Sequence, residues 1–99
     1  MGFNMDLSTS SNTITIEGNI KSISDFQKIK QSTEAIVKTH KSITIKIIDS
    51  LSITSSVIGY FNKLVLKDEI KIKMDIGNAQ LMNLIKDLNL VSTFNASKV

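Results

Sequence analysis

Residues 42–76 read SITIKIIDSLSITSSVIGYFNKLVLKDEIKIKMDI, and this stretch decides the fold. At its start, isoleucines at positions 43, 45 and 47 alternate with polar residues, which predicts a largely buried strand. At its end, apolar residues at positions 70, 72, 74 and 76 alternate strictly with Lys71, Lys73 and Asp75. Between the two strands, apolar residues at positions 57, 58, 61, 64 and 65 share one face of a helix. The stretch therefore predicts a β-α-β unit, in which a helix connects two parallel strands.

The residues before this unit predict two further strands and a helix. Apolar residues alternate with polar ones in residues 3–7 and again in 14–20, on either side of a polar turn at 8–12. Ser24 and Gln27 have the spacing of a capping box, so we expect a helix that starts at about Asp25 and ends near His40. The first strand is expected to join an edge of the sheet in the antiparallel direction.

The residues after the unit predict a third helix and a last strand. Asn78 is a good N-cap, Asn89 is expected to close the helix, and residues 91–94 are predicted to form a short strand. The order β-β-α-β-α-β-α-β predicts an α/β fold with a mixed, mainly parallel sheet of four to five strands and three main helices. We expect one domain over residues 1–99, with an edge strand and polar turn in 1–12 and the core in 13–96.

The periodicity of each segment also names the expected core. The predicted core residues are Ile14, Ile16, Phe26, Ile29, Ile36, Ile45, Ile47, Ile58, Phe61, Ile72, Met74, Leu81, Ile85 and Leu88. Tyr60 is expected to be partly exposed.

Composition excludes several kinds of site. The 99 residues contain no cysteine, which excludes disulfides, thiolate metal sites and cysteine nucleophiles. The net charge is +3, but the chain has no arginine and its lysines are scattered singly, so we expect no nucleic-acid partner. No apolar run approaches the roughly 20 residues that a membrane helix needs, and no signal peptide is recognised. We therefore expect a cytoplasmic protein without membrane insertion.

Three loops should lie together, because ligands and partners of open α/β sheets meet the loops beyond the carboxyl ends of parallel strands. These loops are residues 18–24, 49–56 and 77–78. The middle one, which we call the 49–56 segment, is rich in Ser, Thr and Asp and leads directly into a helix. Hydroxyl groups at a helix N-terminus lie where an anion such as phosphate is favoured. Alternatively, Thr54 or Ser55 simply caps the helix.

The element order and this loop resemble the STAS domain, the fold of bacterial anti-sigma factor antagonists. In that family a loop of the form D-[ST]-[ST]-G-[LIV]-G starts the second helix, and residues 54–59 here read TSSVIG. Asp49 also fits, residues 18–21 (GNIK) lie where the family shows G-E-L-D, and residues 74–94 resemble the family's ending. The resemblance covers residues 14–94. Thr54, Val57 and Lys21 depart from the family's Asp, first Gly and upstream Asp.

The resemblance implies a non-enzymatic regulatory module that works in a phosphorylation-controlled partner switch. Family members bind a GHKL-type serine kinase that otherwise holds a sigma factor or another effector, and phosphorylation of the second hydroxyl residue breaks the complex. Carried over to this chain, Ser56 is the phosphoacceptor and Ser55 its neighbour. The expected partner-binding residues are Asp49, Ser52, Thr54, Ser55, Ser56, Asn62 and Lys63.

Two alternatives stay open beside the switch. In one, the chain is a STAS adaptor subunit of a larger complex, such as a lipid-transport assembly, and its loop docks a partner without ever being phosphorylated. In the other, it is a small structural or homo-oligomeric domain. No catalytic, cofactor or metal site is predicted, because His40 is the only histidine, the carboxylates are spread singly and the glycines are isolated.

Overall fold

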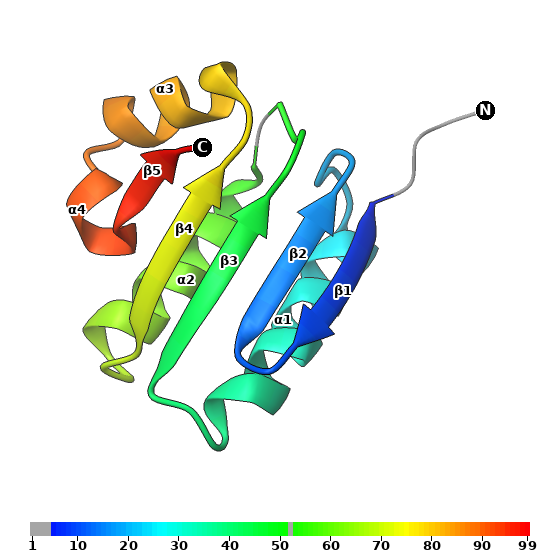
Figure 1. Cartoon of the computed structure of the whole chain (residues 1–99), viewed down its shortest axis with the longest axis vertical. Coiled ribbons are helices and arrows are strands. Elements are labelled where there is room, and N and C mark those ends of the chain that lie inside the picture. The colour runs from blue at the N-terminus through cyan, green and yellow to red at the C-terminus, as the bar shows by residue number, and fades with distance from the viewer. Residues whose placement is uncertain (1–4, 52) are drawn as a thin grey trace.

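The sheet has five strands that lie side by side in their sequence order, β1-β2-β3-β4-β5 (Figure 1). The computed structural model describes residues 5–51 and 53–99. The strands are β1 (Asp6–Ser10), β2 (Thr13–Glu17), β3 (Ser42–Ile47), β4 (Lys71–Ile76) and β5 (Ala96–Lys98). The helices are α1 (Ile23–Val37), α2 (Ser55–Leu66), α3 (Ala79–Asp87) and the short α4 (Val91–Phe94).

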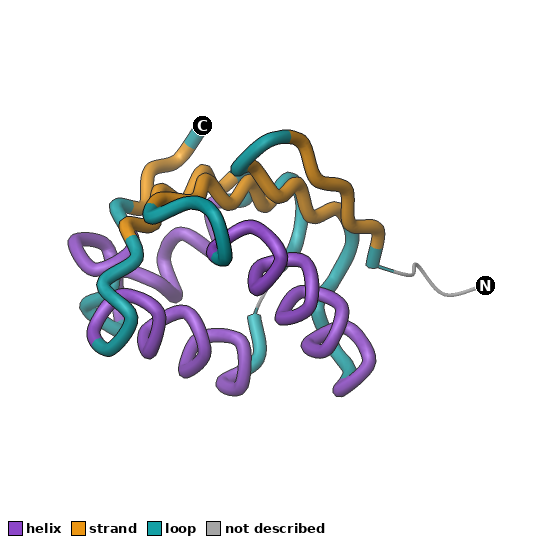
Figure 2. The backbone as a smooth tube through the Cα atoms, turned by 90° about the horizontal axis from the view of Figure 1, so that it is seen from below, coloured by secondary structure: helices purple, strands orange, loops and turns teal. Residues whose placement is uncertain are grey.

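Strand direction and helix placement follow from this order. Strands β2 to β5 run parallel, and β1 pairs with β2 antiparallel at one edge, as predicted. Right-handed crossovers that all advance in one direction across a sheet place their helices on the same face. Figure 2 shows this two-layer arrangement, with every helix on one side of the sheet. The predicted α/β class with a mixed, mainly parallel sheet and three substantial helices is confirmed at this level.

The core lies between the sheet and the helices. Strand residues with odd positions in β3 and even positions in β2 and β4 point toward the helices and are buried, including Ile14, Ile45 and Met74. Ile29, Phe61, Leu81 and Ile85 cover them from the helix side, and each is fully buried. The remaining predicted core residues are also buried, except for Phe26 and Ile58, which are half-buried, and Leu88.

Two burial predictions are wrong. Leu88 is 45% exposed, because α3 ends at Asp87 and Leu88 is the cap residue beyond the buried face. Tyr60, expected to be partly exposed, retains only 7% exposure. Its ring packs edge to face on Phe26, with ring centres 6.1 Å apart, so the contact between α1 and α2 covers it.

The last strand was predicted at the wrong place. Residues 91–94 form α4, and the strand β5 follows it. Asn95 separates the two elements with a left-handed backbone (φ 48°), and its side-chain amide donates a hydrogen bond to the Ile72 carbonyl at 2.9 Å. An asparagine that anchors to β4 in this way ends the helix and turns the chain into the sheet.

The ends of the first elements also differ from prediction. Helix α1 begins at Ile23 because Ser22, rather than Ser24, caps it and accepts the Asp25 N–H at 3.1 Å; it ends at Val37. Strand β1 occupies residues 6–10, part of which was predicted as a turn, and the turn is confined to residues 11–12. The predicted strand residue Phe3 lies outside the described residues.

The face of the sheet away from the helices is polar. Thr15, Lys46 and Asp75 lie in register on adjacent strands of this face. Lys73 forms an ion pair with Asp75 at 3.3 Å. This alternation leaves one face solvated while the other is buried, which explains why two layers suffice.

Candidate functional site

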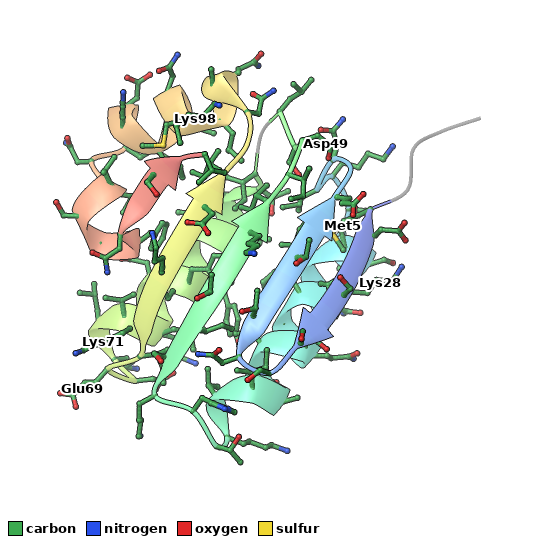
Figure 3. All side chains as sticks on the ribbon, viewed as in Figure 1. Met5, Lys28, Asp49, Glu69, Lys71 and Lys98 are labelled. Atoms are coloured by element: carbon green, nitrogen blue, oxygen red, sulfur yellow. The ribbon has the colours of Figure 1, made fainter. Side chains whose placement is uncertain are left out.

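The three predicted loops meet at the carboxyl ends of β2, β3 and β4. The Gly18 N–H donates to Asp49 Oδ1 at 2.7 Å, and the Leu51 N–H donates to Asn19 Oδ1 at 3.0 Å. Gly77 follows β4 and donates its N–H to the Ile47 carbonyl at 2.8 Å. Figure 3 shows Asp49 at this edge of the molecule. The loops therefore form one connected surface, as their position after parallel strands predicts.

Asp49 acts as an anchor within this surface. Its carboxylate holds the Gly18 amide, and Gly18 has a left-handed backbone (φ 83°) that suits glycine. Asp49 is exposed, but one of its oxygens is already occupied by this contact. Asp49 therefore holds the loop after β2 against the end of β3.

Ser50 was not singled out by the sequence, yet it is fully buried. Its hydroxyl donates to the Gly18 carbonyl at 2.5 Å, which ties the end of β3 to the end of β2. A serine within a run of serines carries no local signal of burial. Only the neighbouring strand reveals its role.

Thr54 is the N-cap of α2, so the capping interpretation is confirmed for this residue. Its hydroxyl accepts the Val57 N–H at 3.3 Å, and Val57 itself is fully buried. Ser55 and Ser56 occupy the first two positions of α2, and both side chains are exposed. Neither hydroxyl forms a hydrogen bond with a described residue, so both are accessible for chemistry or contact.

The other predicted contact residues lie on the outer side of α2. Gly59 and Lys63 are exposed and follow Ser56 at spacings of three and seven residues, which places all three on one stripe of the helix. Leu66 extends the stripe and is 71% exposed. Asn62 is half-buried beside it. The predicted contact residue Ser52 lies outside the described residues.

Three exposed apolar side chains accompany the loops, and the sequence-based site did not include them. Ile23 is 77% exposed, Ile48 is 45% exposed and Leu51 is 46% exposed. Ile48 directly follows β3, and Leu51 lies within the 49–56 segment. The 49–56 segment has two apolar residues, Leu51 and Ile53, and because Ile53 is buried, the sequence alone does not show which of them is exposed.

The tyrosine behind this stripe has an unusual environment. The buried Tyr60 hydroxyl has no hydrogen-bond partner among the described residues. Burial, together with the negative charges of Glu34 and Asp68, raises the pKa of Tyr60 from 10.0 to about 12. The side chain therefore stays neutral and contributes packing between α1 and α2.

Other chemistry finds little support in the described part of the chain. Residues 5–51 and 53–99 contain no group of three or more His, Asp or Glu side chains placed to hold a metal ion. His40 Nδ1 lies 3.0 Å from the Thr39 hydroxyl and 3.2 Å from the Ile36 carbonyl, at the opposite end of α1 from the loops. None of the helices among these residues has the length and apolar character to span a bilayer.

Comparison with protein-family models found no match, and comparisons with curated proteins and with solved structures found none either. The resemblance to the STAS domain therefore stays a prediction from the sequence.

Proposed function

We propose that this protein is a non-enzymatic docking module of the anti-sigma factor antagonist type, and that phosphorylation of Ser56 controls its partner complex. The docking surface consists of the 49–56 segment and the outer side of α2. The partner is a protein, a GHKL-type serine kinase that holds a sigma factor or another effector, in the bacterial cytoplasm.

The observation that carries the proposal is that some hydroxyl groups of the 49–56 segment form hydrogen bonds within the fold, while others are exposed and form none with a described residue. Ser50 and Thr54 hold the structure together through hydrogen bonds to Gly18 and Val57. Ser55 and Ser56 do not, and their side chains are exposed. A kinase could therefore modify Ser56 without breaking a contact of the fold.

A phosphate on Ser56 would be tolerated by the fold and disruptive to a complex. It would lie in the first turn of α2, which contains no acidic residue and where the free N–H groups favour an anion. It would add about −1.5 to −2 charges to a surface that a partner must desolvate. Thr54 keeps the capping role at the position where the family has Asp.

The test compares Ser56→Asp and Ser56→Ala. We expect Ser56→Asp to change the free energy of unfolding by no more than about 0.3–1 kcal/mol, since an acid in the first turn is mildly favourable. It should lower the affinity for the partner recovered with the unmodified chain as bait by at least about tenfold, because the new charge lacks a counter-ion in the interface. Ser56→Ala should keep the affinity.

Two control variants separate a local effect from a general effect of charge. Ser24→Asp places an acid at the same second position of α1, and Ser42→Asp places one in β3 on the face of the sheet away from the helices. Ser24→Asp should stabilise the protein less than Ser56→Asp, because the first turn of α1 already contains Asp25, and Ser42→Asp should leave partner affinity unchanged. Unchanged affinity for Ser56→Asp would contradict the switch.

Lys63 tests the extent of the surface. Lys63→Glu reverses a charge on the exposed stripe of α2 and should weaken the partner complex, while melting temperature stays within a few degrees. Lys30→Glu on α1 is the matched control, because Lys30 is also an exposed helical lysine. If Lys30→Glu weakened the complex and Lys63→Glu did not, the docking surface would be on α1 instead.

One observation favours the second candidate, a STAS adaptor that is never phosphorylated, as in a lipid-transport assembly. Ile48 and Leu51 expose apolar surface beside the 49–56 segment, and such residues suit a lasting contact. This candidate predicts that Leu51→Ser weakens the partner complex and that no phosphate is found on Ser55 or Ser56 by mass spectrometry of the native protein.

A further inference from the structure

The outer edge of β1 is free. Strand β1 pairs with β2 on one side, and on its other side no strand lies among residues 5–51 and 53–99 (Figure 1). The two strands are joined by a two-residue turn at Ser11 and Asn12. Counted from this turn, the alternation of an antiparallel ladder directs the backbone N–H and C=O groups of Leu7 and Thr9 outward.

Apart from the charge of Asp6 at one end, this edge lacks the features that usually prevent strand addition. Residues 6–10 read DLSTS, without lysine or proline, and the pairing with β2 is regular over all five residues, without a bulge. The opposite edge is different, since β5 has only three residues, contains Lys98 and packs against α3 and α4. Strand addition therefore favours β1.

A groove runs below the edge, between β1 and α1. One hollow of about 410 Å³ is lined by Thr9, Ala35 and Ile36, among others, and a second of about 330 Å³ by Leu7 and Lys28, among others. Gln31 and Ser32 line both hollows, so the two hollows are adjacent along the edge. The helix side of the edge thus offers space for the side chains of an added strand.

We propose that a second copy of this chain adds its β1 to this edge, antiparallel and with Ser8 opposite Ser8 on the two-fold axis. In this register Leu7 lies opposite Thr9 of the second copy, and all four outward backbone groups of each strand find partners. Each Leu7 side chain, half-buried in one copy, points to the helix side and enters the hollow lined by Ala35 and Ile36. The polar face of the sheet continues across the axis.

Charge favours the antiparallel direction. Asp6 and Glu17 are register partners at one end of β1, although Lys28 lines the hollow beside Asp6. Among the described residues, none that lines the hollow at the other end, beside His40, is acidic. Antiparallel pairing therefore keeps the acidic ends of the two copies apart, whereas parallel pairing in register would place Asp6 against Asp6.

The resulting assembly has one continuous sheet and two docking surfaces. Because the axis is perpendicular to the sheet, the 49–56 segments of the two copies lie at opposite ends of the dimer. Each copy can then bind a partner independently. If two partners are linked to each other, binding of the first raises the effective concentration of the second, so the linked pair binds the dimer more tightly than a single partner does.

The experiment uses the absence of cysteine in the chain. In Ser8→Cys, the two thiols would meet at a non-hydrogen-bonded antiparallel pair, where Cα atoms are about 4.5 Å apart and a disulfide can form. We expect oxidation to convert most of the protein to a dimer on a non-reducing gel. Ser42→Cys is the control, because Ser42 is an exposed serine in a strand at the centre of the sheet, and it should stay monomeric.

The unmodified chain is measured in parallel by light scattering over a range of concentrations. The mass should rise from 10.9 kDa to twice that value, and Ser8→Glu should raise the dimer dissociation constant at least tenfold, while Ser42→Glu leaves it unchanged. The proposal is overturned by a monomer at every concentration up to about 0.5 mM, including a monomer that captures an extended peptide at β1. Cross-linking of Ser42→Cys in place of Ser8→Cys would overturn it too.

Discussion

Gly77 lies where the turn after β4 meets the end of β3, and replacing it by alanine should strongly destabilise the protein. A Cβ atom at this position would lie 2.2 Å from the backbone oxygen of Ile48 and 3.1 Å from its carbonyl carbon. An ordinary contact begins at 3.4 Å, so the oxygen and the new atom would have to separate by a further 1.2 Å. The atoms that must move are backbone, and they are held by the hydrogen bond from the Gly77 N–H to Ile47.

The magnitude follows from the cost of overpacking. Forcing a methyl group into a packed region with backbone displacement typically costs about 1–3 kcal/mol, and a backbone atom on the other side of the contact argues for the upper part of that range. For a domain of this size, each kcal/mol lowers the melting temperature by about 4–8 °C. We therefore expect Gly77→Ala to melt at least about 8 °C below the unmodified protein.

Gly59 provides a matched control. It is an exposed glycine within α2, and an added Cβ would meet nothing within 4 Å. Glycine in a helix costs about 0.5–1 kcal/mol relative to alanine, so Gly59→Ala should stabilise the protein by about that amount. The same chemical change should therefore have opposite signs at the two positions.

Urea denaturation followed by circular dichroism measures both variants, with thermal melting as a second measurement. If Gly77→Ala differs from the unmodified protein by less than about 0.5 kcal/mol, the close approach between Gly77 and Ile48 is not a feature of the folded protein. If Gly59→Ala is as destabilising as Gly77→Ala, the reasoning from local space fails altogether.

Ile45 is fully buried in the central strand, so Ile45→Ala should cost about 2–5 kcal/mol; a denaturation loss below about half of one kcal/mol would contradict its central position. Tyr60→Phe removes a buried hydroxyl without a partner among the described residues and should leave stability equal or higher by about 1–3 kcal/mol. The raised pKa of Tyr60 adds a pH dependence: because ionisation is easier in the unfolded chain, stability should be full below pH 10 and fall as the pH rises toward 12. Tyr60→Phe should remove that part of the loss, and equal losses in both proteins over this range would refute the assignment.

Much of the fold could be predicted from local patterns. The alternation in residues 42–47 and 70–76 and the apolar face of residues 57–65 correspond to β3, β4 and α2, because burial of one face imposes a period of two or of 3.6 on the sequence. Capping was predictable where one candidate stood alone, as at Asn78, whose side chain accepts the Gln80 and Leu81 N–H groups. It failed at α1, where Ser22 and Ser24 compete and only the backbone path decides between them.

Some features of the candidate site could likewise be predicted from local patterns, and others could not. Its location beyond the parallel strands and the exposure of Ser55 and Ser56 follow from element order and helix position. The roles of Asp49 and Ser50 do not, since both bind Gly18, which lies 31 and 32 residues earlier in the chain. A local sequence pattern holds no information on a hydrogen-bond partner that is so far away in the sequence.

The sequence by itself determined that β2, β3, β4 and the three long helices form, which face of each is apolar, and that most strands run parallel. Tertiary structure alone decided that residues 91–94 form a helix, since Asn95 reaches Ile72 in β4 to end it. It also decided that Tyr60 is covered by α1, that the hydroxyl of Ser50 is buried, and that β1 keeps a free edge. The physical reason is range: periodicity records whether a position faces the core, whereas caps, hydrogen bonds and strand edges depend on which distant segment becomes the neighbour.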